Sequence, residues 1–106
     1  MNFVNEFKTL RSTVLHHITT SLIFIRAEQQ IRFKEPVTYH NNLIKGVSGY
    51  GDVEIWDENN NRVDVSLHDI DVSTLCYIAD YMMNPHNIII EPQSKQYDRT
   101  RKNSFI

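Results

Sequence analysis

Apolar residues at the start of the chain recur every three or four positions, which is the spacing of one face of an α-helix. No Gly or Pro occurs before residue 36. The pattern predicts a long helix over residues 3–29, about 40 Å in length, and a helix this long favours packing against another chain. The β-branched run TTSLIFI lowers helix propensity slightly but does not interrupt the stripe. The predicted apolar face consists of Phe3, Phe7, Leu10, Val14, Ile18, Leu22 and Ile25.

The period changes after this segment. Ile31 and Phe33 alternate with two basic residues, which is typical of a β-strand with one buried face. Pro36 either interrupts this strand or marks it as a sheet edge. The next stretch, HNNLIKGVSGYG, contains all three glycines of the chain and is predicted to be a loop over residues 40–51.

A β-hairpin is the clearest element of the pattern. Apolar and polar residues alternate from Val53 to Trp56 and again from Val63 to His68, and the DENNN segment between them is rich in turn-forming residues. The alternation points Val53 inwards and leaves Trp56 on the outward face. A large aromatic residue in that position is a common anchor of protein interfaces.

The segment after the hairpin predicts a second, shorter helix. Asp71 is placed to cap its N-terminus, and Ile70 and Leu75 are spaced for a hydrophobic staple. The helix is expected to end near Asn84, because the following proline disfavours a helical residue before it. Its apolar stripe consists of Leu75, Ile78, Ala79, Met82 and Met83.

The last predicted element is NIIIEP, a short buried strand closed by Pro92. The element order α–β–β–β–α–β predicts an α+β fold with a long N-terminal helix and a second short helix. Its sheet is antiparallel or mixed, has three to four strands and contains the hairpin. Residues 1–91 are expected to form a single α+β domain, and residues 92–106 a basic C-terminal tail.

Charge is unevenly distributed along the chain. Residues 1–50 hold six basic and three acidic residues, residues 51–91 hold one and nine, and residues 92–106 hold four and one. The three segments therefore carry formal charges of +3, −8 and +3, which sum to −2. This layout suits contacts between copies or with a charged partner, and it is equally compatible with an ordinary soluble surface.

The turn segment has one feature of a metal site. Asp57, Asn59 and Asn61 match the first three ligands of an EF-hand calcium loop. Arg62 stands where that loop needs glycine, and His68 stands where it needs a bidentate glutamate, so the segment is interpreted as a turn. The five histidines are scattered, and the single cysteine has no predicted histidine partner. We predict no metal, no cofactor and no catalytic residue; an enzyme using carboxylates of the hairpin is a third alternative.

The location of the protein is predicted from what the N-terminal sequence contains. Charged residues occupy the positions where a signal peptide needs an apolar core. The longest apolar run, SLIFI, is far below the ~20 residues needed to cross a bilayer. One cysteine forms no intrachain disulfide, which fits a reducing compartment. We therefore expect no membrane association, a cytoplasmic location where the protein is made, and incorporation into a virion if it is a virion component.

The segment VEIWDENNNRVDVSLHDIDVSTLCYIADYM, together with heavy use of Asn and Ile, resembles small accessory proteins of tailed bacteriophages and mobile elements. The resemblance covers about a third of the chain and implies no catalytic residues. It implies a structural or accessory role, including that of a phage virion component.

We expect a non-enzymatic protein–protein interaction or structural protein whose partner is another protein or copies of itself. The alternative is a nucleic-acid-associated regulatory protein that uses the basic tail and the first helix, although a pI of about 6.2 is unlike most such proteins. The candidate partner-binding residues are Trp56 on the hairpin and Tyr97, Arg99, Arg101, Lys102, Phe105 and Ile106 in the tail.

Overall fold

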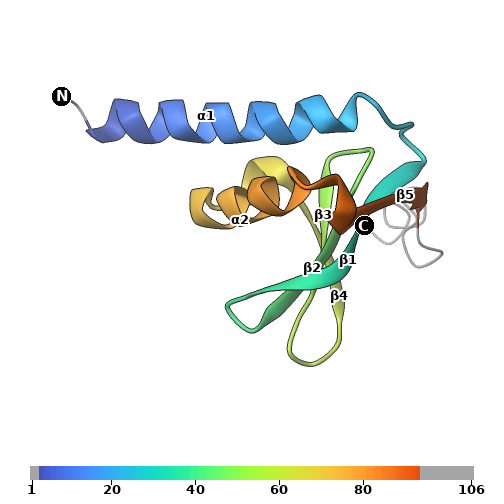
Figure 1. Cartoon of the computed structure of the whole chain (residues 1–106). Helices are drawn as coiled ribbons and strands as arrows, with labels where there is room; N and C mark the ends of the chain where they lie inside the picture. The colour runs from blue at the N-terminus through green and yellow to red at the C-terminus, as the bar shows by residue number, and fades with distance from the viewer. Residues whose placement is uncertain (1–2, 94–106) are drawn as a thin grey trace, which may run out of the picture.

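The computed structural model describes residues 3–93, and the side chains of residues 10–93. In this part of the chain two α-helices lie on one side of a five-stranded antiparallel sheet (Figure 1). The α+β class is therefore confirmed. The elements are α1 (Phe3–Leu22), β1 (Gln29–Tyr39), β2 (Asn42–Ser48), β3 (Asp52–Trp56), β4 (Arg62–Ser66), the 3-10 helix η1 (Leu67–Asp69), α2 (Val72–Met82), the 3-10 helix η2 (Pro85–Asn87) and β5 (Ile88–Pro92).

The sheet is a four-stranded meander with one strand added from the end of the described chain. Its strand order is β4-β3-β2-β1-β5, and every neighbouring pair is antiparallel. The predicted hairpin is confirmed as β3 and β4, with residues 57–61 between them. The number of strands was underestimated, because β2 lies within the segment predicted to be a loop.

A tight two-residue turn explains why this segment forms a strand. Tyr39 pairs with Asn42, and the two residues between them, His40 and Asn41, have φ angles of 52° and 66°. Two consecutive residues with positive φ make the turn type whose twist matches that of a β-hairpin. The chain therefore reverses directly from β1 into β2, and no loop separates the two strands.

Helix α1 is shorter than predicted. It ends at Leu22 rather than at residue 29. The hydroxyls of Thr19 and Ser21 donate to the carbonyl oxygens of Leu15 and His17, at 2.8 and 3.2 Å, and such bonds weaken a helix slightly. Residues 23–28 then turn the chain into β1, where the side chain of Gln29 accepts a hydrogen bond from the backbone N–H of Arg26 at 2.8 Å.

Side chains from both helices, from the three strands β1, β2 and β3, and from residues 67–70 form the hydrophobic core. On α1 the predicted stripe is confirmed at Val14, Ile18 and Leu22, whereas Leu10 is 46% exposed. Figure 1 shows α1 lying alongside α2, with its N-terminal turns running past the start of α2. The remaining core residues are Ile31, Phe33, Ile44, Val47, Val53, Leu67, Ile70, Leu75, Ile78 and Met82.

Helix α2 begins as predicted. The carboxylate of Asp71 accepts hydrogen bonds from the backbone N–H of Thr74 at 3.1 Å and from its hydroxyl at 2.6 Å. Ile70 and Leu75 are both buried, in agreement with a hydrophobic staple. The helix ends at Met82, close to the predicted end. Met83 was wrongly assigned to the apolar stripe: it follows the last turn and is exposed.

Two strand predictions need correction. Pro36 does not end β1, but the pairing of β1 with β2 is irregular between Arg32 and Val37, so the proline lies where the ladder is interrupted. The predicted buried strand is β5, which is an edge strand beside β1 and is only partly buried. Its central residue, Ile90, is 51% exposed, because the helices do not extend over this edge.

Candidate functional site

Asp57 stabilises the turn between β3 and β4. One carboxylate oxygen of Asp57 accepts hydrogen bonds from the backbone N–H groups of Asn59 and Asn61, at 2.9 and 2.8 Å. Asn60 has a φ angle of 63°, which asparagine tolerates better than most residues. These bonds support the interpretation of DENNN as a turn. Within residues 3–93, no group of three His, Cys, Asp or Glu side chains lies close enough to hold a metal ion.

The helix-free face of the sheet carries a hollow of about 490 Å³ that is lined mainly by β1, with further residues from β2, β3 and β5. Gly46 lies opposite Arg32 of β1 and opposite Glu54 of β3, so a position without a side chain separates two long side chains. A methyl group at Gly46 would collide with the backbone carbonyl oxygen of Ile31. Glycine therefore allows β1 and β2 to approach each other closely.

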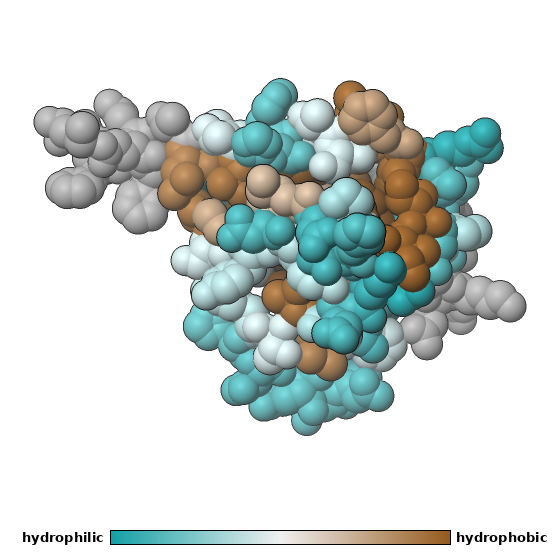
Figure 2. Space-filling view, viewed as in Figure 1, coloured by the Kyte–Doolittle hydropathy of each residue, from teal (hydrophilic) through white to brown (hydrophobic). Residues whose placement is uncertain are grey.

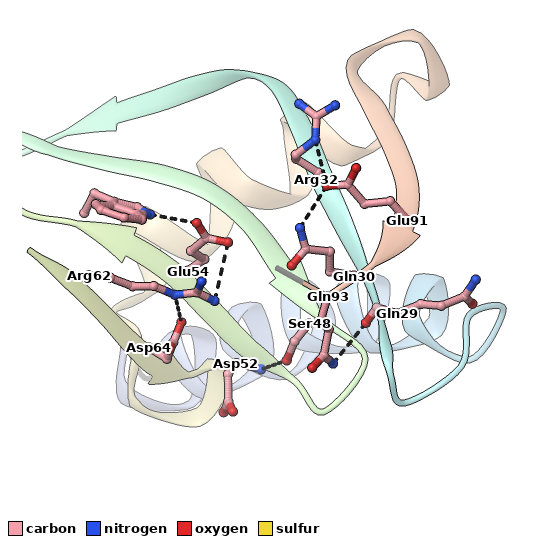
Figure 3. Close-up of polar contacts among 11 residues, drawn as sticks. Gln29, Gln30, Arg32, Ser48, Asp52, Glu54, Arg62, Asp64, Glu91 and Gln93 are labelled. Atoms are coloured by element: carbon pink, nitrogen blue, oxygen red, sulfur yellow. Dashed lines mark hydrogen bonds and ion pairs between the residues drawn. The ribbon is translucent and has the colours of Figure 1, made fainter. Parts of the chain in front are cut away.

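One wall of the hollow is a polar cluster on β3 and β4. The indole N–H of Trp56 donates to the Glu54 carboxylate at 2.7 Å, and the Arg62 guanidinium lies 3.6 Å from the other oxygen of that carboxylate. Arg62 also pairs with Asp64 at 3.1 Å. The side chains of Arg62 and Glu54 are only 10% and 13% exposed, so this cluster holds its members in fixed positions (Figure 3).

The opposite wall is a second polar cluster, on β1 and β5. The Glu91 carboxylate lies 2.8 Å from the guanidinium Nε of Arg32, and it accepts a hydrogen bond from the Gln30 amide at 3.0 Å. Figure 3 shows these three side chains meeting where the two strands run side by side. The cluster links the edge strand β5 to β1, and it neutralises Glu91.

Two lysine side chains also line the hollow. The ammonium group of Lys45 lies 4.2 Å from the centre of the Trp56 ring, which is a cation–π contact. Lys34, on β1, is exposed at the rim. Among the residues that the structure describes, no ion pair involves either ammonium group. Trp56 does lie on the outward face, as predicted, but it is half-buried rather than freely exposed.

A second surface, which is apolar, lies at the end of the molecule where α1 ends and β5 lies (Figure 2). Ile23 and Phe24, in the connection after α1, are 74% and 80% exposed. Ile90 of β5 faces the same side of the sheet as the helices, because it is paired with the core residue Ile31. Figure 2 shows apolar surface at the end of the molecule where α1 ends and β5 lies (right-hand side). Among the described strands β5 pairs with β1 alone, so no strand within residues 3–93 covers its outer edge.

The sequence interpretation located Trp56 but not the residues around it. Lys45 and Gly46 were missed because their segment was predicted to be a loop. Ile90 was missed because β5 was predicted to be buried. The tail residues predicted to bind a partner, Tyr97, Arg99, Arg101, Lys102, Phe105 and Ile106, lie outside the described part of the chain.

Comparisons with known proteins identify no relative of this chain: no family model, no curated protein and no solved structure matches it. Neither of the two described α-helices combines the length and apolar character needed to span a bilayer. Two surfaces stand out in residues 3–93: the open edge of β5 with its apolar neighbours, and the polar hollow on the helix-free face.

Proposed function

We propose that the protein is a non-enzymatic interaction protein that assembles with copies of itself through the outer edge of β5. The observation that carries this proposal is an open strand edge next to exposed apolar side chains. Unpaired backbone groups along an edge strand form a ready template for another strand. Exposed apolar patches on soluble proteins mark interaction sites. At β5 both features coincide at Ile90; Ile23 and Phe24, in the connection from α1 to β1, are exposed as well.

The sequence of β5 suits pairing with itself. The strand has five residues, and Ile90 is its central one. If two copies pair antiparallel about this residue, Ile90 of each copy lies opposite Ile90 of the other on the helix-bearing side. Such an interface uses the same surface twice and closes as a dimer with two-fold symmetry. The two sheets would join into one continuous sheet.

Charge favours β5 over the opposite edge of the sheet. The one charged residue of β5, Glu91, is already neutralised by Arg32 of the same chain at 2.8 Å. Two β5 edges can therefore approach without repulsion between like charges. The other edge strand, β4, carries the charged residues Arg62 and Asp64, and charged side chains are a common protection against edge-to-edge pairing.

A non-enzymatic role is supported by the state of the carboxylates on the helix-free face. Glu54 and Glu91 each interact with two neighbouring side chains, so both carboxylates already have partners within the protein. The resemblance to phage and mobile-element proteins favours a structural or accessory role for the assembly, including a place in a virion.

The experiment compares two matched charge substitutions on the two edge strands. Ile90 and Val63 are 51% and 47% exposed, on β5 and β4. Light scattering after size-exclusion chromatography should give a dimer for the wild type and for Val63→Lys, and a monomer for Ile90→Lys, because two lysines would face each other across the interface. A monomeric wild type at high concentration would rule out self-assembly. Equal effects of both substitutions would rule out β5 as the interface.

A further inference from the structure

We propose that the hollow on the helix-free face binds a nucleotide, either free or within a single strand. Lys34 and Lys45 would hold its phosphate, and its base would lie beside Trp56. This site is on the opposite side of the sheet from the helices and from the exposed side chain of Ile90. It therefore does not depend on the assembly proposed above.

The charge of the hollow favours an anion. Its lining contains three cationic side chains and two carboxylates. Both carboxylates are already engaged: Glu54 by Trp56 and Arg62, and Glu91 by Arg32 and Gln30. The cluster of Glu54, Arg62 and Asp64 carries a net charge of −1, and the pair of Arg32 and Glu91 carries none. With the ammonium groups of Lys34 and Lys45, the hollow and its walls therefore carry a net charge of +1. An ammonium group is a compact charge with three hydrogen-bond donors, and it is a common ligand for phosphate.

Trp56 supplies a flat aromatic surface whose orientation is fixed. Its indole N–H donates to Glu54 at 2.7 Å, and Glu54 is held in turn by Arg62. The ammonium group of Lys45 lies over the ring, 4.2 Å from its centre, so a base that stacks on this face takes the place of the ammonium group. Aromatic and basic side chains on the open face of an antiparallel sheet are a recurring arrangement for binding unstacked bases. A ring held in place before binding loses less entropy when a ligand stacks on it.

The size of the hollow fits a ligand of this class. Its volume of about 490 Å³ lies within the usual range of small-molecule sites, roughly 300–1,000 Å³. Its lining comes from β1, β2, β3 and β5. The hollow opens to solvent, so a nucleotide at the end of a strand could enter as well as a free one.

Trp56 is the single tryptophan of the chain, so its fluorescence reports directly on the hollow. The full-length protein is titrated with adenosine monophosphate, with a short single-stranded oligonucleotide and with inorganic phosphate at low salt. We expect saturable quenching by adenosine monophosphate and by the oligonucleotide. The probe that binds with the higher affinity shows whether the site prefers a free nucleotide or a strand. Inorganic phosphate should compete without quenching. Added salt should weaken the binding of the strand.

Substitutions locate the ligand. Lys34→Met and Lys45→Met should each weaken binding about tenfold, the usual effect of losing one hydrogen bond to a charged group. Lys8→Met, on α1 on the other side of the sheet, is the matched control and should bind like the wild type. The tail variant Arg99→Gln/Arg101→Gln should also bind like the wild type, which distinguishes the hollow from the basic tail.

Several outcomes would overturn the assignment. They are the absence of quenching by either nucleotide probe at millimolar concentration, equal weakening by Lys8→Met and Lys45→Met, or a loss of binding in the tail variant as large as that in the lysine variants. Ile90→Lys should retain full nucleotide binding even if it is monomeric. Failure of self-assembly and failure of nucleotide binding can therefore be told apart.

Discussion

Asp71 shows how one side chain fixes the start of an element. Its carboxylate occupies the N-cap position of α2 and bonds both the backbone N–H and the hydroxyl of Thr74. The hydrogen bond from the Thr74 side chain is the main cause that lowers the pKa of Asp71, with smaller contributions from backbone hydrogen bonds and from His40. Because the folded state favours the ionised carboxylate, Asp71 stabilises the fold above its ordinary pKa and loses this effect as the pH falls.

The cap at Asp71 can be tested with two substitutions. Asp71→Ala should lower the free energy of unfolding by about 1 kcal/mol at pH 7, because a free N–H group of α2 loses its acceptor. Asp71→Asn keeps a hydrogen-bond acceptor at this position, so its free energy of unfolding should fall by much less. Urea denaturation at pH 7 and at pH 3 should show the wild type more stable than Asp71→Asn at pH 7, with the difference shrinking at pH 3. A difference that grows at pH 3 would contradict the direction of the pKa shift.

At the scale of elements, the sequence predicted those whose pattern is local. The alternation in β3 and β4, the turn between them and the cap of α2 each depend on neighbouring residues, and all three are confirmed. β2 was missed because its pairing is irregular between Ile44 and Gly46, which disrupts strict alternation of apolar and polar residues. The end of α1 was misplaced because the stripe continues in the sequence after the helix has stopped, at Ile25.

The hollow depends on tertiary contacts that the pattern of apolar and polar residues in the sequence does not predict. Gly46 lies opposite residues fourteen positions before it and eight positions after it, in β1 and β3. The pairing of Arg32 with Glu91 joins β1 to β5, and β2, β3, β4 and α2 lie between these two strands in the chain. Side chains at this distance are brought together by sheet order, which a single sequence does not reveal. Trp56 could be assigned to the correct face because its neighbours within β3 define that face.

The role of Gly46 in β2 leads to a prediction about stability. Gly46→Ala should lower the free energy of unfolding by about 2 kcal/mol or more, because the new methyl group meets the backbone of Ile31, which cannot rotate away. Leu43→Ala, at an exposed position of the same strand, is the control and should change stability by about 0.5 kcal/mol or less. Chemical denaturation of both variants provides the measurement. Equal stability of the two variants would show that β1 and β2 can separate at no cost.

The described part of the molecule divides into a sheet joined by backbone hydrogen bonds between strands and a helix, α1, held mainly by packing. α1 lies alongside α2 (Figure 1), and among its described side chains those of Val14, Ile18 and Leu22 are buried, on one face. Arg11 of α1 donates a hydrogen bond to the carbonyl oxygen of His68, at 2.7 Å. Elements with few buried contacts open at a lower free energy than the core of a fold.

We therefore expect α1 to open before the sheet does. In native-state hydrogen exchange with increasing denaturant, the amides of Val14 and Ile18 should exchange through an opening with a lower free energy than those of Ile31, Val47 and Val53 in the three central strands. Ile18→Ala removes a fully buried side chain from α1 and should widen this gap, because it weakens the docked helix and leaves the sheet intact. Exchange of the α1 and sheet amides at one common free energy would instead show that the helix and the sheet unfold as a single cooperative unit.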